Sequence, residues 1–237
     1  MPFISSFPLK SAVQSALAHV VEVLDFAILH PARISRKRAI LDAADYVATS
    51  MREAVGVYTS REVLNIALSR TEIEGHFMEF GVYRGGTLRH IAKHARKATT
   101  VSGFDSFQGL PESWNSGLDK GAFDLQGKLP SVPEPVRLYP GWFNETLPLW
   151  VKENKGPVAF LHIDCDLYSS TKVIFDSLVD QIVPGTVIVF DEYFGLPNWR
   201  EHEFRAFGEL VAEARLAYSY ICYAKYQVAV LITGKGV

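Results

Sequence analysis

The sequence predicts an α/β fold: a doubly wound, mostly parallel, seven-stranded sheet with Rossmann-like topology and an N-terminal helical cap. A short strand at 76–82, a glycine-opened helix at 83–95 and a strand at 99–105 form a β-α-β unit, which opens such a sheet. Two later apolar strands, at 158–163 and 186–190, both end in acidic residues. Acids at strand ends indicate a polar site, because ligands of open parallel sheets bind outside the carboxyl ends of the strands.

The first 70 residues are expected to form the cap, because their apolar residues recur at helical spacing. One helix is expected at 11–29, ended by Pro31, and a second at 35–50. The second carries a basic run that most often marks a solvated face, with binding of an anionic substrate group as the lesser alternative. Ser60 is the expected N-cap of a third helix that ends near Arg70.

The remaining elements follow from apolar periodicity and from glycine and proline breaks. We expect a brief strand at 136–139, helices at 147–154, 169–182 and 201–215, and a closing antiparallel pair of strands at 217–223 and 227–233. Residues 106–135 are rich in glycine and proline, which indicates a long ordered loop over a site. The chain is therefore interpreted as a single domain, 1–237, with a cap at 1–70 and a core at 71–237 that includes this lid loop.

Composition restricts the function classes. Lys and Arg total 24 against 26 Asp and Glu, so no strongly basic surface suited to nucleic acid is expected. Cys165 and Cys222 lie too far apart for a metal knuckle and suggest a reducing compartment. No apolar run is long enough to span a membrane, and acidic residues interrupt the N-terminal segment, unlike a secretory signal. A cytoplasmic location is the expectation.

The turn from Glu79 to Thr87 resembles a cofactor loop, and three cofactor classes compete for it. A phosphate loop is rejected, because Thr87 stands where its lysine is required. A dinucleotide fingerprint is disfavoured, because Tyr83 replaces its second glycine. An acid followed by glycines suits S-adenosylmethionine, whose ammonium group needs an acceptor and whose ribose needs an acid. Asp105 follows the loop at about the 20-residue spacing of a ribose-binding acid, although a tight structural turn explains the loop equally well.

Four acids follow the two central strands: Asp164, Asp166, Asp191 and Glu192. Neighbouring strands are only about 4.8 Å apart, so acids at their ends can converge on one ion. If the strand continued, Asp164 and Asp166 would face the same side, one to bind metal and the other to take a proton. Asp166 as a cap of the following helix is the alternative.

Five motifs together resemble the macrocin O-methyltransferase (TylF-like) family of class I S-adenosylmethionine-dependent methyltransferases. The similarity runs from about Phe77 to Glu209, in the segments FMEFGVYRGGTL, FDSFQGLPESW, LYPGWFNETLP, HIDCDLYSST and FDEY. The resemblance implies a class I methyltransferase sheet, S-adenosylmethionine, Mg²⁺ and hydroxyl substrates on sugars or other natural products. It also implies a homo-oligomer.

The resemblance also assigns roles to residues. It implies cofactor contacts by Glu79, Gly81, Tyr83, Gly85, Gly86, Thr87, Asp105, Ser106, Phe107, Trp142 and Asp164. It implies metal ligation by Asp164, Asp191 and Glu192, where the family usually has aspartate at the last position. Asp166 is the expected general base, because the lysine of catechol-type relatives is replaced here by Leu167.

Burial or contact with the methyl acceptor is expected of other residues near these motifs. His162 is expected to fill the interior and Cys165 to be a buried thiol. Loop aromatics and two polar residues are candidate contacts for the methyl acceptor: Trp114, Trp142, Tyr193, Phe194, Trp199, Arg200 and His202.

The predicted function is S-adenosylmethionine-dependent and Mg²⁺-dependent O-methylation of a sugar or glycosylated natural product, a hydroxylated small molecule. The expected partners include neither nucleic acid nor a membrane. Two alternatives remain: an NAD-dependent oxidoreductase of Rossmann topology, and a non-catalytic binding or oligomerisation protein that keeps the fold.

Overall fold

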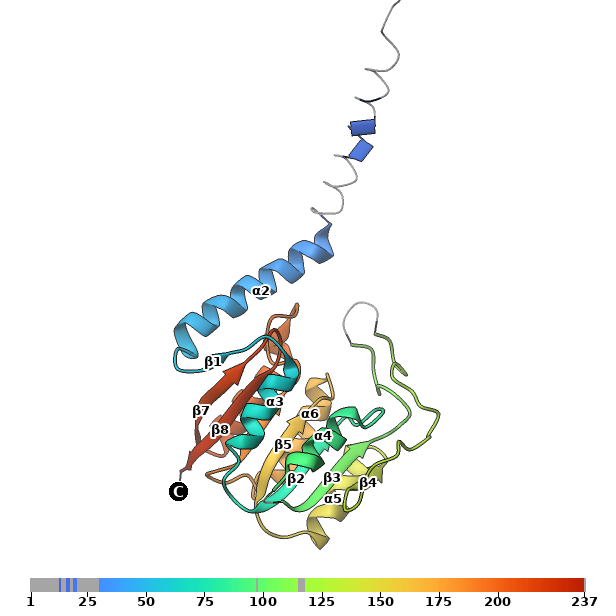
Figure 1. Ribbon diagram of the computed structural model, residues 1–237, viewed down its shortest axis with the longest axis vertical. Coiled ribbons are helices and arrows are strands. Elements are labelled where there is room, and N and C mark those ends of the chain that lie inside the picture. The colour runs from blue at the N-terminus through green and yellow to red at the C-terminus, as the bar shows by residue number, and fades with distance from the viewer. Residues whose placement is uncertain are drawn as a thin grey trace, which may run out of the picture.

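The fold is built on one eight-stranded sheet in a computed structural model (Figure 1). The structure describes residues 30–96, 98–114 and 118–236, together with Val13, Ala16, Leu17, His19 and Val20. The strand order is β1-β7-β8-β6-β5-β2-β3-β4. The strands are β1 (Val55–Gly56), β2 (Gly75–Phe80), β3 (Ala98–Asp105), β4 (Arg137–Pro140), β5 (Val158–Ile163), β6 (Val187–Phe190), β7 (Leu216–Tyr223) and β8 (Val228–Lys235).

The sheet is mostly parallel, as predicted. Strands β2 to β6 pair in parallel, while β8 runs antiparallel to both β6 and β7. The seven predicted strands are all present. The eighth, β1, is a two-residue strand that pairs with β7 at the edge of the sheet and is too short to leave a periodic signal in the sequence.

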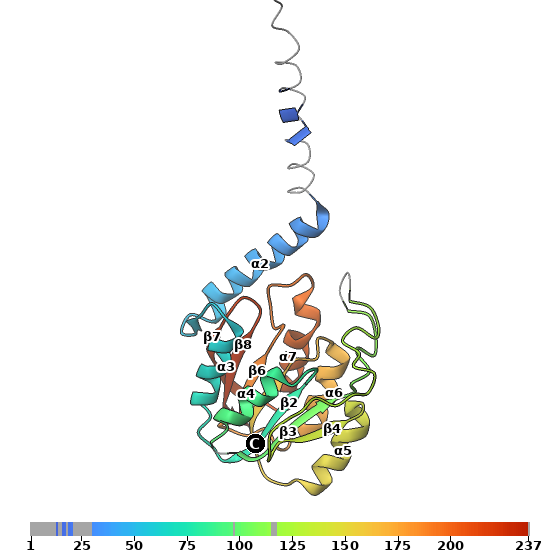
Figure 2. The ribbon, with the colours of Figure 1, turned by 45° about the vertical axis from the view of Figure 1, so that its right-hand side comes forward.

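Helices cover both faces of the sheet, which makes it doubly wound (Figures 1 and 2). The helices are α2 (Pro31–Ser50), α3 (Ser60–Ser69), α4 (Gly86–His94), α5 (Phe143–Glu153), α6 (Tyr168–Leu178) and α7 (Glu203–Glu213), with a 3₁₀ turn, η1 (Trp199–Glu201), before α7. Apolar residues of α3 and α4 pack on one face, and those of α5, α6 and α7 on the other. All six residues of β5 are buried, as expected for a central parallel strand covered on both sides.

The N-terminal helices differ from the prediction at their starts. Of the helix predicted at 11–29, only five residues are described; they are helical and exposed, and the rest lies outside the described residues. Pro31 begins α2 rather than ending a helix, because proline fits the first helical turn and His30 caps it. Helix α3 is capped by Thr59 rather than Ser60, in a reciprocal capping box with Glu62.

Later boundaries also shift. Helix α5 begins at Phe143, four residues before the expected start, and contains Pro148. Helix α6 ends at Leu178, and α7 starts at Glu203 after η1. Within the described part of residues 106–135 there is an isolated β-bridge between Trp114 and Leu118 but no helix or strand. None of the described helices is long and apolar enough to cross a membrane.

Candidate functional site

The carboxyl ends of β2, β3, β5 and β6 open onto a cavity of about 640 Å³. This volume lies within the usual range for small-molecule sites. The predicted residues that line it are Gly81, Tyr83, Asp105, Ser106, Trp142, Asp164, Asp166 and Glu192. The other predicted residues do not line it: Glu79, Gly85, Gly86, Thr87, Phe107 and Asp191.

Gly81 lets two strand ends approach each other. Its backbone has a φ of +92°, and a Cβ placed there would lie 1.7 Å from the carbonyl oxygen of Asp164. The Asp164 N–H donates to the carbonyl of Phe80 at 2.9 Å, and the Gly81 N–H donates to that of Phe104 at 3.0 Å. Glycine is therefore required here to bring the turn after β2 against the acid-bearing end of β5.

The carboxylate of Asp105 holds the loops on either side of it. One oxygen accepts the N–H groups of Val82 at 2.9 Å and Tyr83 at 2.7 Å, and the other accepts the N–H of Phe107 at 2.7 Å. Three backbone donors satisfy most of the carboxylate, which leaves acceptor capacity on Oδ1 for a ligand hydroxyl. Asp105 thus has a structural role in addition to the predicted ribose contact.

Glu79 lies inside the protein rather than at the cavity. Its side chain is fully buried, and the Nδ1 of His162 donates to its Oε1 at 3.0 Å. Burial raises the pKa of Glu79, while the bond to His162 opposes this shift. Glu79 does not line the cavity, so its direct contact with a cofactor ammonium group stays a prediction.

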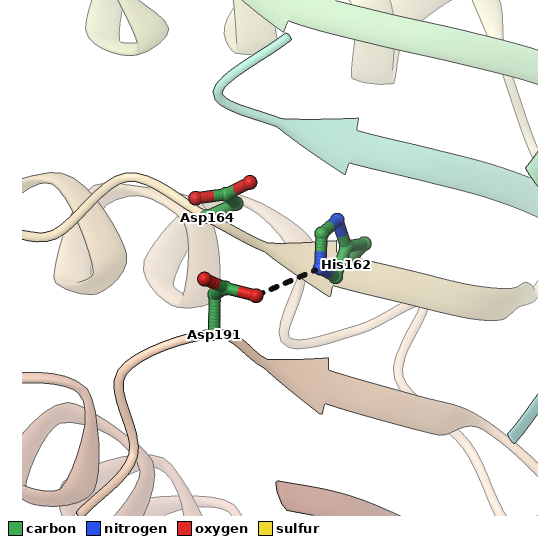
Figure 3. Close-up of side chains that lie close together, drawn as sticks. All are labelled: His162, Asp164 and Asp191. Atoms are coloured by element: carbon green, nitrogen blue, oxygen red, sulfur yellow. Dashed lines mark ion pairs between the residues drawn. The ribbon is translucent and has the colours of Figure 1, made fainter. Parts of the chain in front are cut away.

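His162 connects Glu79 to the acids of the site, of which Figure 3 shows Asp164 and Asp191. Its Nε2 lies 3.9 Å from Oδ1 of Asp191. Burial alone would lower the pKa of His162, but the hydrogen bond to Glu79 and the surrounding carboxylates raise it to about 9. These contacts favour the protonated imidazole, whose charge would partly balance the neighbouring acids.

Five carboxyl groups crowd the end of the sheet beside this histidine. Burial raises the pKa of Asp164, Glu192 and Glu203 well above the ordinary values, and the charge of Asp191 adds to each shift. Burial and Asp191 also raise the pKa of Asp166 to about 7. Such crowding is unfavourable for the ionised acids unless a cation lies among them.

The donor set fits a divalent cation. Carboxylate oxygens of Asp164 and Asp191 lie within 4.8 Å of each other and of a ring nitrogen of His162. A protonated imidazole has no free lone pair, so the carboxylates would be the ligands. Glu192 Oε2 and Glu203 Oε1 are buried without a hydrogen-bond partner. Carboxylate oxygens are ligands that Mg²⁺ prefers, and those without a hydrogen-bond partner are free to bind a cation.

Asp166 is set apart from the other acids by its backbone. Strand β5 ends at Ile163 and Asp166 has a φ of +64°, so the strand does not continue to Asp166 and strand parity does not apply to it. It does not cap helix α6 either, because the N-cap is Leu167 and no side chain bonds there. Its carboxylate lines the cavity and has no hydrogen-bond partner among the described residues.

Two residues of the site were not predicted from the sequence. Glu203 is fully buried and accepts the N–H of Glu192 at 3.0 Å, although an acid in the first turn of an amphipathic helix ordinarily faces solvent. Gln227 donates from Nε2 to Oδ1 of Asp191 at 3.2 Å. Neither has a local sequence signal, because each reaches the site only through the fold.

Described residues of the lid loop line the cavity and contact later parts of the chain. Glu112 accepts a hydrogen bond from Ser169 at 2.6 Å, and Trp114 lies edge-on to His202 with ring centroids 6.2 Å apart. Among the proposed acceptor contacts, Trp114 and Trp142 line the cavity. The other three aromatics, Tyr193, Phe194 and Trp199, are buried in the core. Cys165 is buried, as expected.

Together, the mostly parallel sheet, the helices on both faces and the site at the strand ends define a class I methyltransferase fold. Residues 78–193 match the family model described as a methyltransferase domain. Two solved structures share the fold. The O-methyltransferase NovP is 26% identical with a TM-score of 0.53, over 73% of this chain and 77% of that one. The calicheamicin methyltransferase CalS11 is 19% identical with a TM-score of 0.58, over 85% and 93%.

The chain is also similar to curated O-methyltransferases. It is 32% identical over 146 residues to the 8-demethyl-8-(2,3-dimethoxy-alpha-L-rhamnosyl)-tetracenomycin-C 4'-O-methyltransferase of Streptomyces olivaceus. This match covers 51% of the chain and 54% of the relative. Across three such relatives, the match spans between 54% and 62% of their length.

Proposed function

We propose that this protein is an S-adenosylmethionine-dependent and Mg²⁺-dependent O-methyltransferase that acts on a hydroxyl of a sugar or glycosylated natural product. The observation that carries the proposal is the group of buried acids at the edge of the cavity, on the strand ends of a class I methyltransferase fold. The TylF-like assignment is part of the proposal.

The cofactor would lie against the turn from Glu79 to Thr87, here called the glycine turn. Asp105 would accept a ribose hydroxyl through Oδ1, while Gly81, Tyr83 and Ser106 line the adjoining part of the cavity. Trp142 lies at the N-terminus of α5 and also lines it. These residues offer a mostly apolar surface with a few acceptors, which suits a sulfonium cofactor that carries no phosphate.

Asp164, Asp191 and Glu192 would hold the cation, with Glu192 using the oxygen that has no partner. A bound divalent cation lowers the pKa of a hydroxyl that it coordinates. Asp166 would accept the proton of that hydroxyl, because its carboxylate lines the same cavity and has no hydrogen-bond partner among the described residues. A neutral alcohol is a poor nucleophile, so removal of this proton is what the reaction requires.

The cavity lining supports a neutral acceptor. Among the described residues that line it there are four acids and no Lys, Arg or His. Aromatic and aliphatic side chains of the lid face it: Leu110, Trp114, Leu118 and Phe123. A hydroxylated molecule with apolar faces, such as a deoxysugar on an aglycone, fits this lining, and the rhamnosyl substrate in the name of one relative supports the choice.

We also propose a single catalytic domain, located in the cytoplasm, that assembles as a homo-oligomer. Val13, Leu17 and Val20 recur at helical spacing and are each more than half exposed, so they do not cover their own domain. An apolar stripe of this kind supports association through the N-terminal segment.

S-adenosylhomocysteine is expected to raise the melting temperature. A ligand that binds only the folded state stabilises it by about 2.7 kcal/mol when present at 100 times its dissociation constant. Differential scanning fluorimetry with S-adenosylhomocysteine and, separately, NAD measures this effect. A shift with NAD alone would favour the oxidoreductase alternative, and no shift with either ligand would contradict the cofactor assignment.

EDTA is expected to stop methyl transfer, and excess Mg²⁺ to restore it, because the acids that would hold the cation are crowded and partly unpaired without it. Transfer of a labelled methyl group to a panel of sugars and glycosides, with and without chelator, measures this dependence. Activity that is indifferent to EDTA would remove the metal from the proposal. A protein that binds S-adenosylhomocysteine but methylates no acceptor would favour the non-catalytic alternative.

A further inference from the structure

The segment from Asp191 to Glu203 carries three of the crowded acids and lies outside the strands. Its two ends are joined where Glu203 accepts the N–H of Glu192 at 3.0 Å. The segment therefore acts as a closed loop whose position sets where the carboxylate of Glu192 lies relative to Asp164.

Helix α2 contacts this loop near its second end through one carboxylate. Asp42 accepts hydrogen bonds from Trp199 Nε1 at 2.9 Å and from Arg200 at 2.9 and 3.2 Å. Trp199 is 2% exposed, so Asp42, on the surface, bonds to a ring that is packed in the core. The guanidinium of Arg200 also lies 4.1 Å from the Trp199 ring centroid. Asp42 thus holds η1, which ends two residues before Glu203.

A second contact joins α2 to the residue next to Glu192. The hydroxyl of Tyr46 lies 2.5 Å from that of Tyr220 on β7, which in turn lies 2.8 Å from the hydroxyl of Tyr193. Tyr193 is almost fully buried and directly follows Glu192 in the chain. Tyr46 also packs edge-on against Trp199 and Phe204, so both contacts belong to one interface.

We infer that α2 is a brace for the cation site: Asp42 and Tyr46 are positioning residues that set the affinity of the acidic cluster for a divalent cation. This inference rests on the proposed function and extends it to a helix that contacts neither the cavity nor the predicted ligands. The physical reason is that carboxylates bind a cation tightly only when they are held in place before it arrives, and residues behind the ligands supply that support.

The test is titration of the full-length protein with Mn²⁺, a paramagnetic substitute for Mg²⁺, followed by electron paramagnetic resonance of free Mn²⁺. Asp42→Ala and Tyr46→Phe are each expected to weaken Mn²⁺ binding by about tenfold, as is typical for residues behind metal ligands. The dissociation constant for S-adenosylhomocysteine is expected to stay unchanged, because none of its predicted contacts lies on the segment from Asp191 to Glu203.

The chain provides matched controls. Asp45→Ala removes a carboxylate from the exposed face of the same helix, and Tyr58→Phe removes the hydroxyl of a tyrosine that is 95% exposed. Both are expected to bind Mn²⁺ as the unmodified protein does. Circular dichroism of each variant checks that the fold is intact, and Tyr46→Phe keeps the ring packing if Asp42→Ala proves unstable.

The outcomes separate the two proposals. If the unmodified protein binds no Mn²⁺, the metal site of the proposed function is wrong. If it binds Mn²⁺ and both variants bind equally well, the brace alone is refuted. Parallel losses of Mn²⁺ and S-adenosylhomocysteine binding would also overturn the brace, because they would show a general effect on stability.

Discussion

Replacement of Asp166 by Asn is expected to lower the methyl-transfer turnover by about 10²- to 10⁴-fold, the usual contribution of a general base. The Asn side chain has nearly the same size but cannot take the proton of the acceptor hydroxyl. Affinity for S-adenosylhomocysteine is expected to stay within about twofold, because an interaction made only in the transition state affects turnover rather than binding. Single-turnover kinetics together with calorimetric titration measure both quantities.

Asp180→Asn is the matched control, because Asp180 is exposed just beyond α6 and does not line the cavity. It is expected to leave turnover unchanged. Turnover in Asp166→Asn equal to that of the unmodified protein would remove Asp166 as the base. A large loss of cofactor affinity instead would place Asp166 among the binding residues.

Gly81→Ala is expected to destabilise the fold by about 3 kcal/mol or more, at the upper end of overpacking effects. The new Cβ would lie 1.7 Å from the carbonyl oxygen of Asp164, and that atom belongs to backbone, which cannot rotate away. The positive φ of Gly81 adds strain for any residue with a Cβ. The midpoint of urea unfolding measures the change.

Gly86→Ala provides the comparison within the same turn. A Cβ at Gly86 would meet no atom within 4 Å, and Gly86 begins α4, where alanine is favourable. Its unfolding midpoint is expected to match or exceed that of the unmodified protein. Equal midpoints for Gly81→Ala and Gly86→Ala would show that β2 and β5 can separate at their ends without cost.

The sheet could be predicted because its strands are short apolar runs separated by helical periodicity. Strand β5 and the acids behind it stand out, since a fully buried parallel strand reads as a continuous apolar segment. Helix boundaries that are set by capping could not be predicted from apolar periodicity. Pro31 begins α2 and Thr59 caps α3 through local hydrogen bonds and backbone preferences, which leave no periodic signal. The two-residue β1 exists only because β7 lies beside it.

Part of the candidate site could also be predicted, namely residues at the carboxyl end of a strand or within three positions after it. Gly81, Asp105, Asp164, Asp166 and Glu192 all line the cavity, since the fold brings strand ends together. Glu203 could not be predicted, because its burial depends on how η1 and α7 pack against the loop after β6. For His162, strand position correctly indicated burial but not the partners at each end of its ring.

The three backbone hydrogen bonds to Asp105 have a consequence for how a cofactor would bind. They order the glycine turn and the start of the lid loop without help from any ligand. The conformational entropy of these segments is lost during folding rather than during association, so a preorganised site of this kind favours affinity. We therefore expect little movement of the glycine turn on cofactor binding, and amide hydrogen exchange at Val82 and Tyr83 that is slow even in the free protein.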